Sequence, residues 1–314
     1  MRPIRIVFMG TPDFAVASLD ALLKANYNVA AVVTAPDKPA GRGQKIHSSS
    51  VKKYAVKNGL KVLQPTKLKD AVFVQELKDL QANLFIVVAF RMLPEVVWKM
   101  PLFGTFNLHA SLLPDYRGAA PINWAIINGE TRTGVSTFFI DHTIDTGHII
   151  QQEALNIGED EILGTLYNRL MIAGSQLVVS TVKLIEKNQV RTLAQVAQYP
   201  KLAPKIFPDT CQINWQDSID NIYNLIRGLN PYPAAWTSLH DDTGTTTVKI
   251  FDVSKATENH DHPTGTILST KKSLRVAVKG GYIEIRHLQL AGRRKMSSRD
   301  LLNGHTFSEK SMFR

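Results

Sequence analysis

Two polar side chains that could act on a carbonyl group stand two positions apart near the centre of the sequence. Asn107 and His109 lie in the segment 105–110, where polar and apolar residues alternate. In a β-strand this spacing places both side chains on one face, about 7 Å apart along the strand. A carboxamide N–H can stabilise an oxyanion, and an imidazole can carry a proton. The pattern predicts a polar catalytic face, although a turn-capping asparagine and a half-buried structural histidine would also fit it.

A loop that contains strong turn-forming residues follows this strand. Residues 111–118 contain Pro114 and Gly118, which belong to the residue types that most strongly mark turns. A shaped loop directly after two polar side chains is typical of a binding site. The loop therefore favours the catalytic interpretation of Asn107 and His109 over the structural one.

A carboxylate that could act with the histidine lies beyond a later predicted strand, residues 134–140. Asp145 belongs to the stretch 141–147 that follows this strand. Open parallel sheets bind ligands beyond the carboxyl ends of their strands, so we expect this stretch and the loop after His109 to converge on one rim. A carboxylate there would orient the imidazole or relay a proton. The stretch 145–147 also has the composition of an ordinary turn, which fits equally well.

Strands and helices alternate through the first half of the sequence. Short apolar runs predict strands at 4–9, 29–33, 61–63, 84–89, 105–109 and 134–140. Apolar residues at helical spacing predict helices at 13–24, 50–57, 71–81, 121–128 and 162–187. This alternation indicates an α/β fold with a parallel sheet covered on both faces. The stretch 34–50 shows no periodicity and predicts a long irregular loop.

The composition changes after residue 188, and a second domain is expected beyond a linker. Residues 189–208 carry three prolines and no helical spacing of apolar residues. A helix is expected at 218–227, and short β-like runs follow at 236–239, 246–253, 265–268, 274–278 and 282–288. Short strands with irregular turns predict a small barrel or sandwich. We therefore expect domains at 1–188 and 209–314, joined by a linker at 189–208.

Basic residues are concentrated in two stretches. The formal net charge is +10, and seven Lys or Arg residues accompany a single acid, Asp37, between positions 36 and 61. Nine accompany a single acid, Glu284, between positions 271 and 299. Two such stretches in different parts of the chain indicate contacts with phosphate groups.

Cysteine content and hydropathy exclude several protein classes. The 314 residues include one cysteine, Cys211, so neither an internal disulfide nor a thiolate metal cluster can form. No apolar run approaches the roughly 20 residues of a membrane span, and no charged-then-apolar leader precedes the first predicted strand. These features predict a cytoplasmic protein without membrane contact, and we expect a monomer.

Two other kinds of site are open from the residues alone. A metal centre would draw on His109, Asp141, His142, Asp145 and His148. Their spacing matches no standard ligand pattern, so we expect no metal. A dinucleotide site would suit the alternating strands and helices, but the turn at 10–14 lacks the G-x-G-x-x-G glycines that let the backbone approach a pyrophosphate.

The motifs that carry a family resemblance extend over nearly the whole sequence. They are Asn107-Leu108-His109, Ser111-Leu112-Leu113-Pro114, Arg117-Gly118 and Asp145-Thr146-Gly147, with 10–15, 36–43, 288–292 and 301–304. In these stretches the chain resembles the folate-dependent formyltransferases, and most closely the branch that acts on initiator tRNA. The resemblance implies a Rossmann-like formyltransferase domain followed by an OB-like β-barrel that binds tRNA. It also implies formyl transfer from 10-formyltetrahydrofolate to the methionine amino group of methionyl initiator tRNA, for translation initiation.

The resemblance also implies roles for individual residues. Asn107, His109 and Asp145 would form the catalytic trio. The folate would lie along Ser111, Leu112, Leu113 and Pro114, with Phe90, Arg91, Met92 and Leu93 near its pterin ring. The acceptor end of the tRNA would meet Lys38, Arg42, Gly43 and Lys45.

Two alternatives accompany this interpretation. A formyltransferase acting on a nucleotide-sugar amine would share the trio, but such a small acceptor needs neither the basic loop nor a basic second domain. The alternative of a non-catalytic RNA-binding protein would account for the positive charge, but it leaves the polar face of the strand at 105–109 unexplained.

Overall fold

The computed structural model describes residues 3–40, 45–196, 198–242 and 244–314, which group into two compact units. Unit 1 comprises Met1–Gly118, Gly134–Leu155 and Asn168–Leu202, and unit 2 comprises Ala119–Thr133, Asn156–Tyr167 and Ala203–Arg314. The domains expected from the sequence, 1–188 and 209–314, follow the continuous chain and stay a prediction.

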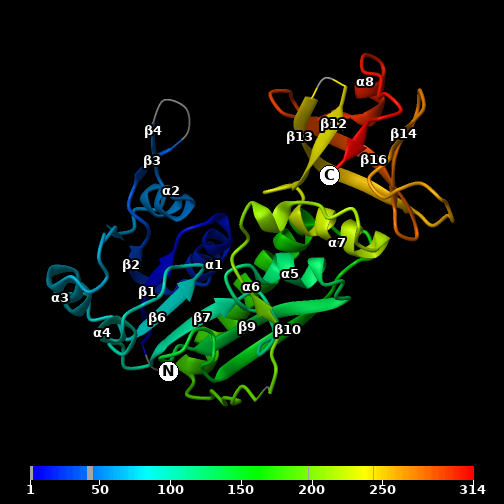
Figure 1. Ribbon diagram of the computed structural model, residues 1–314. Coiled ribbons are helices and arrows are strands. Elements are labelled where there is room, and N and C mark those ends of the chain that lie inside the picture. The colour runs from blue at the N-terminus through cyan, green and yellow to red at the C-terminus, as the bar shows by residue number, and fades with distance from the viewer. Residues whose placement is uncertain (1–2, 41–44, 197, 243) are drawn as a thin grey trace. The chain divides into compact units, whose positions relative to one another are not determined.

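Strands and helices alternate in the first part of the chain (Figure 1). The strands are β1 (Arg5–Gly10), β2 (Asn28–Val33), β3 (Lys38–Ala40), β4 (Lys45–His47), β5 (Val62–Leu63), β6 (Leu84–Val88), β7 (Thr105–His109), β8 (Arg117–Gly118), β9 (Arg132–Phe139), β10 (Ile149–Asn156) and β11 (Leu202–Ala203). The helices are α1 (Asp13–Lys24), α2 (Ser50–Lys57), α3 (Ala71–Asp79), α4 (Glu95–Trp98), α5 (Pro121–Ile127) and α6 (Leu163–Glu186). The predicted alternation is confirmed. Helix α4 escaped prediction because four residues are too few to show a helical period.

Capping side chains explain where several helices begin. The Ser49 hydroxyl accepts a hydrogen bond from the Lys52 N–H at 3.0 Å, and the Asp70 carboxylate accepts one from the Val72 N–H at 2.9 Å. These bonds satisfy N–H groups that have no partner inside the first turn. Helix α5 begins instead with Pro121, which lacks an N–H to satisfy.

The sheet of this part of the chain has the strand order β10-β9-β7-β6-β1-β2-β5. Strands β1, β2, β5, β6 and β7 are parallel, whereas β9 runs antiparallel to β7, with Phe106 opposite Phe139 and His109 opposite Ser136. The expectation that the strand at 134–140 ends at the same rim as β7 is therefore wrong. Alternation of side chains is the same in both strand directions, so the sequence pattern does not reveal the reversal.

Helix α6 lies against one face of this sheet. A Cβ added to Gly174 would approach Leu108 Cδ2 to 2.8 Å, and Thr181 Oγ1 is 2.8 Å from Thr137 Oγ1. The glycine thus lets the helix pack closely on the apolar side of β7. Although α6 has 24 residues, neither it nor any other helix in the described part of the chain is long and apolar enough to cross a membrane.

The opposite face of the sheet carries the polar residues of β7. In its centre, side chains of α3 and α4 pack over the strands in one apolar cluster, which includes Val7, Met9, Phe73, Leu77, Phe85, Val87 and Val97. Asn107 is in register with Val87 on the neighbouring parallel strand, so both residues belong to this face. At β7 the face is covered by the loops 111–118 and 141–147, which bring further polar groups to it.

The stretch predicted to be an irregular loop contains a short hairpin. Strands β3 and β4 pair antiparallel, with Lys38 opposite His47 and Ala40 opposite Lys45. Each strand has only three residues, and Pro39 interrupts the alternation that would have indicated a strand.

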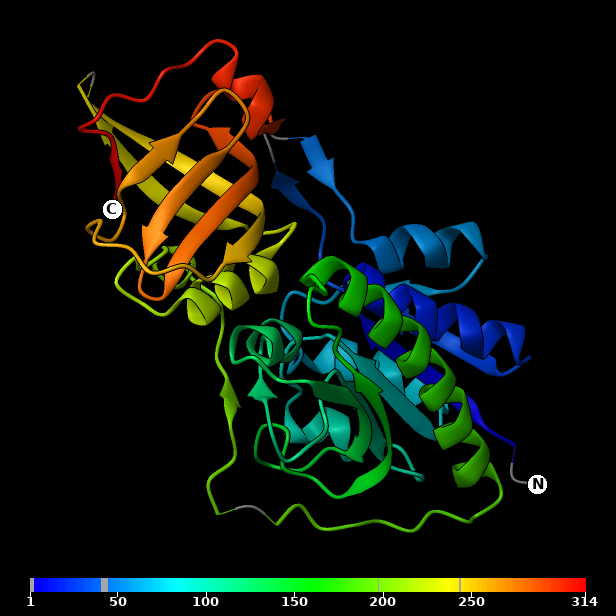
Figure 2. The same cartoon turned by 90° about the vertical axis from the view of Figure 1, so that its right-hand side faces the viewer.

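The second part of the chain contains a nearly closed antiparallel barrel, which confirms the predicted small barrel. Its elements are η1 (Asp209–Cys211), α7 (Ile219–Leu229), β12 (Ala235–Asp241), β13 (Gly244–Ala256), β14 (Ile267–Ser269), β15 (Leu274–Val278), β16 (Gly281–Leu290), β17 (Met296–Ser297), α8 (Ser298–Leu302) and β18 (Met312–Phe313). The strand order is β14-β15-β16-β13-β12-β18, and these strands curl around a common interior (Figure 2). A bridge between Thr266 and Met312 links the two ends of that order. Gly265 permits this closure, because a Cβ there would lie 2.4 Å from the Phe313 oxygen.

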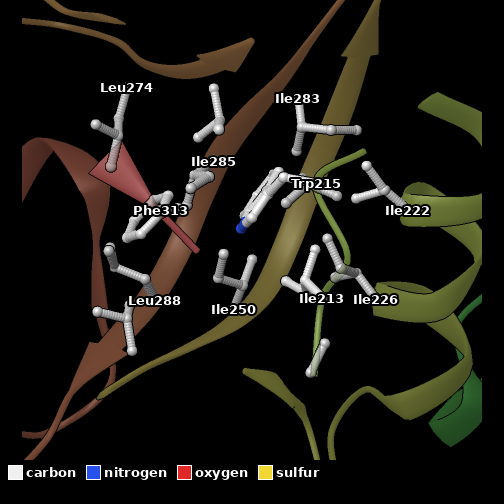
Figure 3. Packing of buried hydrophobic residues seen from close by; sticks show 14 of the residues in the cluster. Ile213, Trp215, Ile222, Ile226, Ile250, Leu274, Ile283, Ile285, Leu288 and Phe313 are labelled. Atoms are coloured by element: carbon white, nitrogen blue, oxygen red, sulfur yellow. The ribbon is translucent and has the colours of Figure 1, made fainter. Parts of the chain in front are cut away.

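The interior of the barrel is filled by a large apolar cluster (Figure 3). Trp215 stacks on Phe313 with 5.6 Å between ring centroids, and its indole N–H donates to Thr237 Oγ1 at 2.9 Å. Helix α7 contributes Ile222 and Ile226 to the same cluster. Because the tryptophan's polar atom has a partner, the ring can be buried without leaving an unsatisfied donor.

Candidate active site

The polar face of β7 presents one buried and one half-buried side chain. His109 is 6% exposed, whereas Asn107 is half-buried. The Asn107 carboxamide makes no hydrogen bond to any residue that the structure describes. An amide with unused donors beside a buried imidazole is suited to bind a polar group of a ligand.

The imidazole of His109 is held by different groups at its two nitrogens. Nε2 lies 2.8 Å from the carbonyl oxygen of Tyr116. A carbonyl can only accept, so Nε2 carries the proton and donates it. Nδ1 lies 3.8 Å from Asp145 Oδ2, which is longer than a hydrogen bond. In the neutral ring Nδ1 is therefore the basic nitrogen, and protonation there would create an ion pair with Asp145.

Asp145 reaches His109 although its strand runs the opposite way, because the loop after β9 folds back over the sheet. Its side chain is 14% exposed, and Oδ2 accepts the N–H of Gly118 at 3.0 Å. Its backbone φ is 56°, in the left-handed region that residues with a Cβ seldom adopt. Tyr116 has a φ of 61°. Unfavourable backbone conformations on both sides of the site must be stabilised by the contacts around them.

The loop at 111–118 is fixed by buried hydrogen bonds. Ser111 is fully buried, and its hydroxyl donates to the Asp115 carbonyl at 2.6 Å. Ser136 of β9 donates to the Ser111 carbonyl at 2.6 Å and accepts the Leu113 N–H at 3.1 Å. Leu113 is buried against apolar neighbours, whereas Leu112 and Pro114 remain partly exposed. Of the four residues predicted along the folate, these last two offer side-chain surface.

The stretch after β6 combines a buried anchor with exposed side chains. Leu93 is 6% exposed and Met92 is 70% exposed. The Arg91 guanidinium donates to the carbonyls of Pro65 and Thr66, and it lies 5.5 Å from the ring centroid of Phe90. Burial lowers the pKa of Arg91.

The predicted tRNA-contacting residues are only partly described. Lys38 is exposed at the start of β3. Lys45 pairs with Ala40 through the backbone, and Arg42 and Gly43 lie outside the described residues. The hairpin is fastened at its base, where Lys52 and Gln64 donate to the Asp37 carboxylate. The Lys52 bond, aided by Gln64, lowers the pKa of Asp37, so this acid stays ionised and its charge is compensated by Lys52.

Several groups that shape the site have no local signal in the sequence. They are the Tyr116 carbonyl, the Gly118 N–H, the Ser136 hydroxyl and Gln195. Gln195 lies in the predicted linker, yet its side chain contacts the backbone of the Asp145 loop. Only the course of the folded chain creates these contacts.

The residues considered for a metal centre are used for other purposes. Asp141 accepts hydrogen bonds from the Thr143 N–H and the Thr146 hydroxyl and so forms a turn. The His142 ring meets Trp98 edge-on at 5.1 Å and is largely exposed. Across residues 3–40, 45–196, 198–242 and 244–314, no group of three or more His, Cys, Asp or Glu side chains is arranged to hold a metal ion.

A pocket of about 300 Å³ lies within unit 2, beside α7 and the barrel. Most of its charged groups have partners. Tyr223 donates to Asp160 at 2.6 Å, and the buried Arg227 donates to the Glu161 carbonyl at 3.0 Å. Burial and the bond to Asp160 raise the pKa of Tyr223. The pocket therefore presents charged groups that are mostly engaged with other protein groups.

Comparisons with known sequences identify two family regions. The sequence model of the formyl transferase family matches residues 4–182, and that of the formyl transferase C-terminal domain matches residues 205–306. The methionyl-tRNA formyltransferase of Flavobacterium johnsoniae is 54% identical over 312 residues, which cover 99% of both chains. That of Parabacteroides distasonis is 54% identical over 309 residues, covering 96% of this chain and 95% of the relative.

Solved structures share the fold at lower identity. A crystal structure of WlaRD, a sugar 3N-formyl transferase, has a TM-score of 0.65 and 22% identity, covering 94% of this chain and 100% of that chain. HypX from Aquifex aeolicus, in complex with tetrahydrofolic acid, has a TM-score of 0.65 and 17% identity, covering 96% of this chain and 47% of that chain. At these identities the likeness shows a common fold.

Proposed function

This chain belongs to the formyl transferase family, among the methionyl-tRNA formyltransferases, and on that basis we propose how its residues transfer the formyl group. The donor is 10-formyltetrahydrofolate, and the acceptor is the methionine amino group of methionyl initiator tRNA. The product serves translation initiation in the cytoplasm. The observation that supports this acceptor is the identity of 54%, across 99% of both chains, to a methionyl-tRNA formyltransferase.

The chemistry follows from the polar face of β7. The neutral amine attacks the formyl carbon, and the carbonyl oxygen becomes an oxyanion while a new C–N bond forms. The bond between the formyl carbon and the folate nitrogen then breaks. The Asn107 carboxamide, with donors unused by the described protein, stabilises the oxyanion, and one preorganised donor of this kind contributes about 3 to 4 kcal/mol.

Proton transfer falls to His109 and Asp145. The amine must lose a proton, and the folate nitrogen must gain one. Since Nε2–H is engaged by the Tyr116 carbonyl, Nδ1 accepts the proton. Asp145, 3.8 Å away, then stabilises the imidazolium until the proton reaches the leaving nitrogen. We assign the ring nitrogens on this contact pattern.

The folate is proposed to lie against the two loops that flank this face. Leu112 and Pro114 offer partly exposed apolar surface, while Ser111 and Leu113 contribute backbone and hold the loop in shape. Met92 and Phe90 offer surface to the pterin ring, and Leu93 anchors the stretch. Arg91, engaged by two carbonyls, holds the turn.

The tRNA acceptor end is proposed to meet Lys38, Arg42, Gly43 and Lys45. A glycine beside a cation lets a backbone approach phosphate closely, and lysines supply charge. The basic stretch at 271–299 supports a second set of phosphate contacts in the barrel.

A competition assay tests this function. Purified protein with 10-formyltetrahydrofolate is given methionyl initiator tRNA and a nucleotide-sugar amine together, and both products are quantified. We expect formylated tRNA and no formylated sugar. Formylation of the sugar alone would retain the proposed catalytic trio but refute the acceptor, and formylation of neither would refute the activity.

A further inference from the structure

Gln195 makes four hydrogen bonds beside the proposed catalytic residues. Its Oε1 accepts from Arg117 Nε at 3.1 Å and from Arg117 Nη2 at 2.7 Å. Its Nε2 donates to the carbonyl oxygens of Asp145 at 3.0 Å and Gly147 at 2.8 Å. A primary carboxamide can accept two bonds and donate two, so this side chain uses its full capacity.

The chemistry of the partners allows only one orientation of this amide. A guanidinium can donate but not accept, and a backbone carbonyl can accept but not donate. Exchanging the oxygen and nitrogen of Gln195 would therefore oppose donor to donor and acceptor to acceptor. The side chain is specified for these partners and no other arrangement satisfies them.

These bonds close a circuit around the Asp145 carboxylate. Arg117 precedes Gly118, whose N–H donates to Asp145 Oδ2, and Gln195 joins Arg117 to the Asp145 carbonyl. The backbone of Asp145 has a φ of 56°, a left-handed conformation that aspartate tolerates better than most residues with a Cβ and that surrounding contacts stabilise further. Gln195 binds the carbonyls on both sides of that turn, at Asp145 and Gly147.

The segment that carries Gln195 is itself tied down at both ends. Leu193 exchanges backbone hydrogen bonds with Ile149 at 2.9 and 2.8 Å. Further along, the Lys201 carbonyl accepts the Tyr116 N–H at 2.6 Å, and the Lys201 N–H donates to the Asp115 carboxylate at 3.0 Å. This part of the predicted linker thus belongs structurally to unit 1 and presents Gln195 from a fixed backbone.

We propose that Gln195 is a positioning residue for the His109–Asp145 pair, a role that rests on the proposed function. It touches neither reacting side chain. It sets the distance between them by fastening the loop of Asp145 to the segment Tyr116–Gly118, against which the His109 ring is hydrogen-bonded.

Two substitutions of Gln195 test whether its hydrogen bonds position the His109–Asp145 pair. Gln195→Met keeps the length of the side chain and removes all four bonds. Gln195→Glu keeps an acceptor for Arg117, but a carboxylate has no N–H for the two carbonyls. The matched control is Gln198→Met, on an exposed residue of the same segment. In methionyl-tRNA formylation, we expect both Gln195 variants to lose about tenfold to hundredfold in kcat with the KM for tRNA nearly unchanged, and the control to match wild type.

A double-mutant comparison with Asp145 separates a positioning role of Gln195 from a purely structural one. In an Asp145→Asn background, adding Gln195→Met should lower kcat by less than about twofold, because the interaction it acts through is already absent. Losses that multiply independently would overturn the proposal, as would a Gln195→Glu variant with wild-type kcat. Thermal unfolding of each variant identifies a temperature at which all variants are folded, so that their kcat values can be compared. A wild-type chain that fails to formylate methionyl-tRNA would refute the proposed function itself, whereas an active wild type with equally active Gln195 variants would refute only the positioning role.

Discussion

The two polar side chains of β7 are prepared for different tasks by what surrounds them. His109 is buried, and its Nε2 is hydrogen-bonded to the Tyr116 carbonyl, so the proposed mechanism assigns proton exchange to Nδ1. Asn107 is half-buried and keeps its hydrogen-bonding groups unused within the described structure. The same strand thus presents the proposed acid–base group and an amide available to a ligand, and substitutions at the two positions should have different consequences.

His109→Ala should lower the turnover of methionyl-tRNA by about a hundredfold to ten-thousandfold, the contribution typical of a general acid–base. The residues proposed to contact tRNA are distant in sequence and unchanged, so the dissociation constant for tRNA should stay near the wild-type value. Single-turnover kinetics and filter binding measure the two quantities. Weakened tRNA binding with normal turnover would contradict the assigned role.

Asn107→Ala should reduce kcat by about a hundredfold to a thousandfold, the cost of losing an oxyanion donor. The unfolding free energy should change by no more than about 0.5 kcal/mol, as for a substitution that breaks no hydrogen bond within the protein. Denaturant unfolding and steady-state kinetics on the same preparation test this combination. A large loss of stability would mean that the carboxamide is a structural group instead.

At the scale of elements, the loop after β9 brings the carboxylate to the histidine. Strand β9 runs antiparallel to β7, so its end lies beside the start of β7, away from His109. The loop at 141–147 must therefore fold back over the sheet, and Gly147 lies where it does so. A Cβ at this position would stand 1.6 Å from the Phe139 oxygen, which no small adjustment of a side chain can relieve.

Gly147→Ala should consequently shift the loop that carries Asp145. We expect destabilisation of about 1 to 3 kcal/mol, as for overpacking at a buried site, together with a fall in kcat. Gly304→Ala is the matched control, because a Cβ there meets nothing within 4 Å. Thermal unfolding and formylation kinetics of both variants test the argument, and equal behaviour of the two would show that the loop tolerates the displacement.

The sequence predicts individual helices and strands better than it predicts strand direction and the contacts between elements. Helix α1 matches its expected bounds of 13–24, because twelve residues show a clear helical period. The antiparallel direction of β9 could not be predicted, because side chains alternate in the same way in parallel and antiparallel strands. The approach of His109 to Asp145 was expected from a shared rim, and the structure achieves it through a folded-back loop. Gln195 could not be predicted at all, because it meets Asp145 across 50 residues of chain.

For the molecule as a whole, charge distribution is the property that distinguishes a nucleic-acid acceptor from a small one. The net charge of +10 is concentrated at 36–61 and 271–299, two stretches that the family models place in different regions. In the first, Lys52 forms an ion pair with the single acid Asp37 and Lys61 forms one with Glu76, so five of the seven cations of the stretch lie outside these two pairs. Phosphate contacts made by such stretches release counterions and must therefore depend on salt.

The salt dependence of tRNA binding can therefore be compared between wild type and variants. For wild type, the logarithm of the tRNA association constant should fall linearly with the logarithm of salt concentration, because each neutralised phosphate releases counterions. Replacing both Lys38 and Arg42 by Ala should reduce the magnitude of that slope by about one for each phosphate that is no longer neutralised, while leaving kcat at saturating tRNA near the wild-type value. Lys187→Ala, which removes an exposed charge at the end of α6, is the control and should leave the slope unchanged. Parallel lines for the double variant and wild type would remove the 36–45 stretch from the tRNA interface, and an equal change in the control would show that total charge rather than this stretch governs binding.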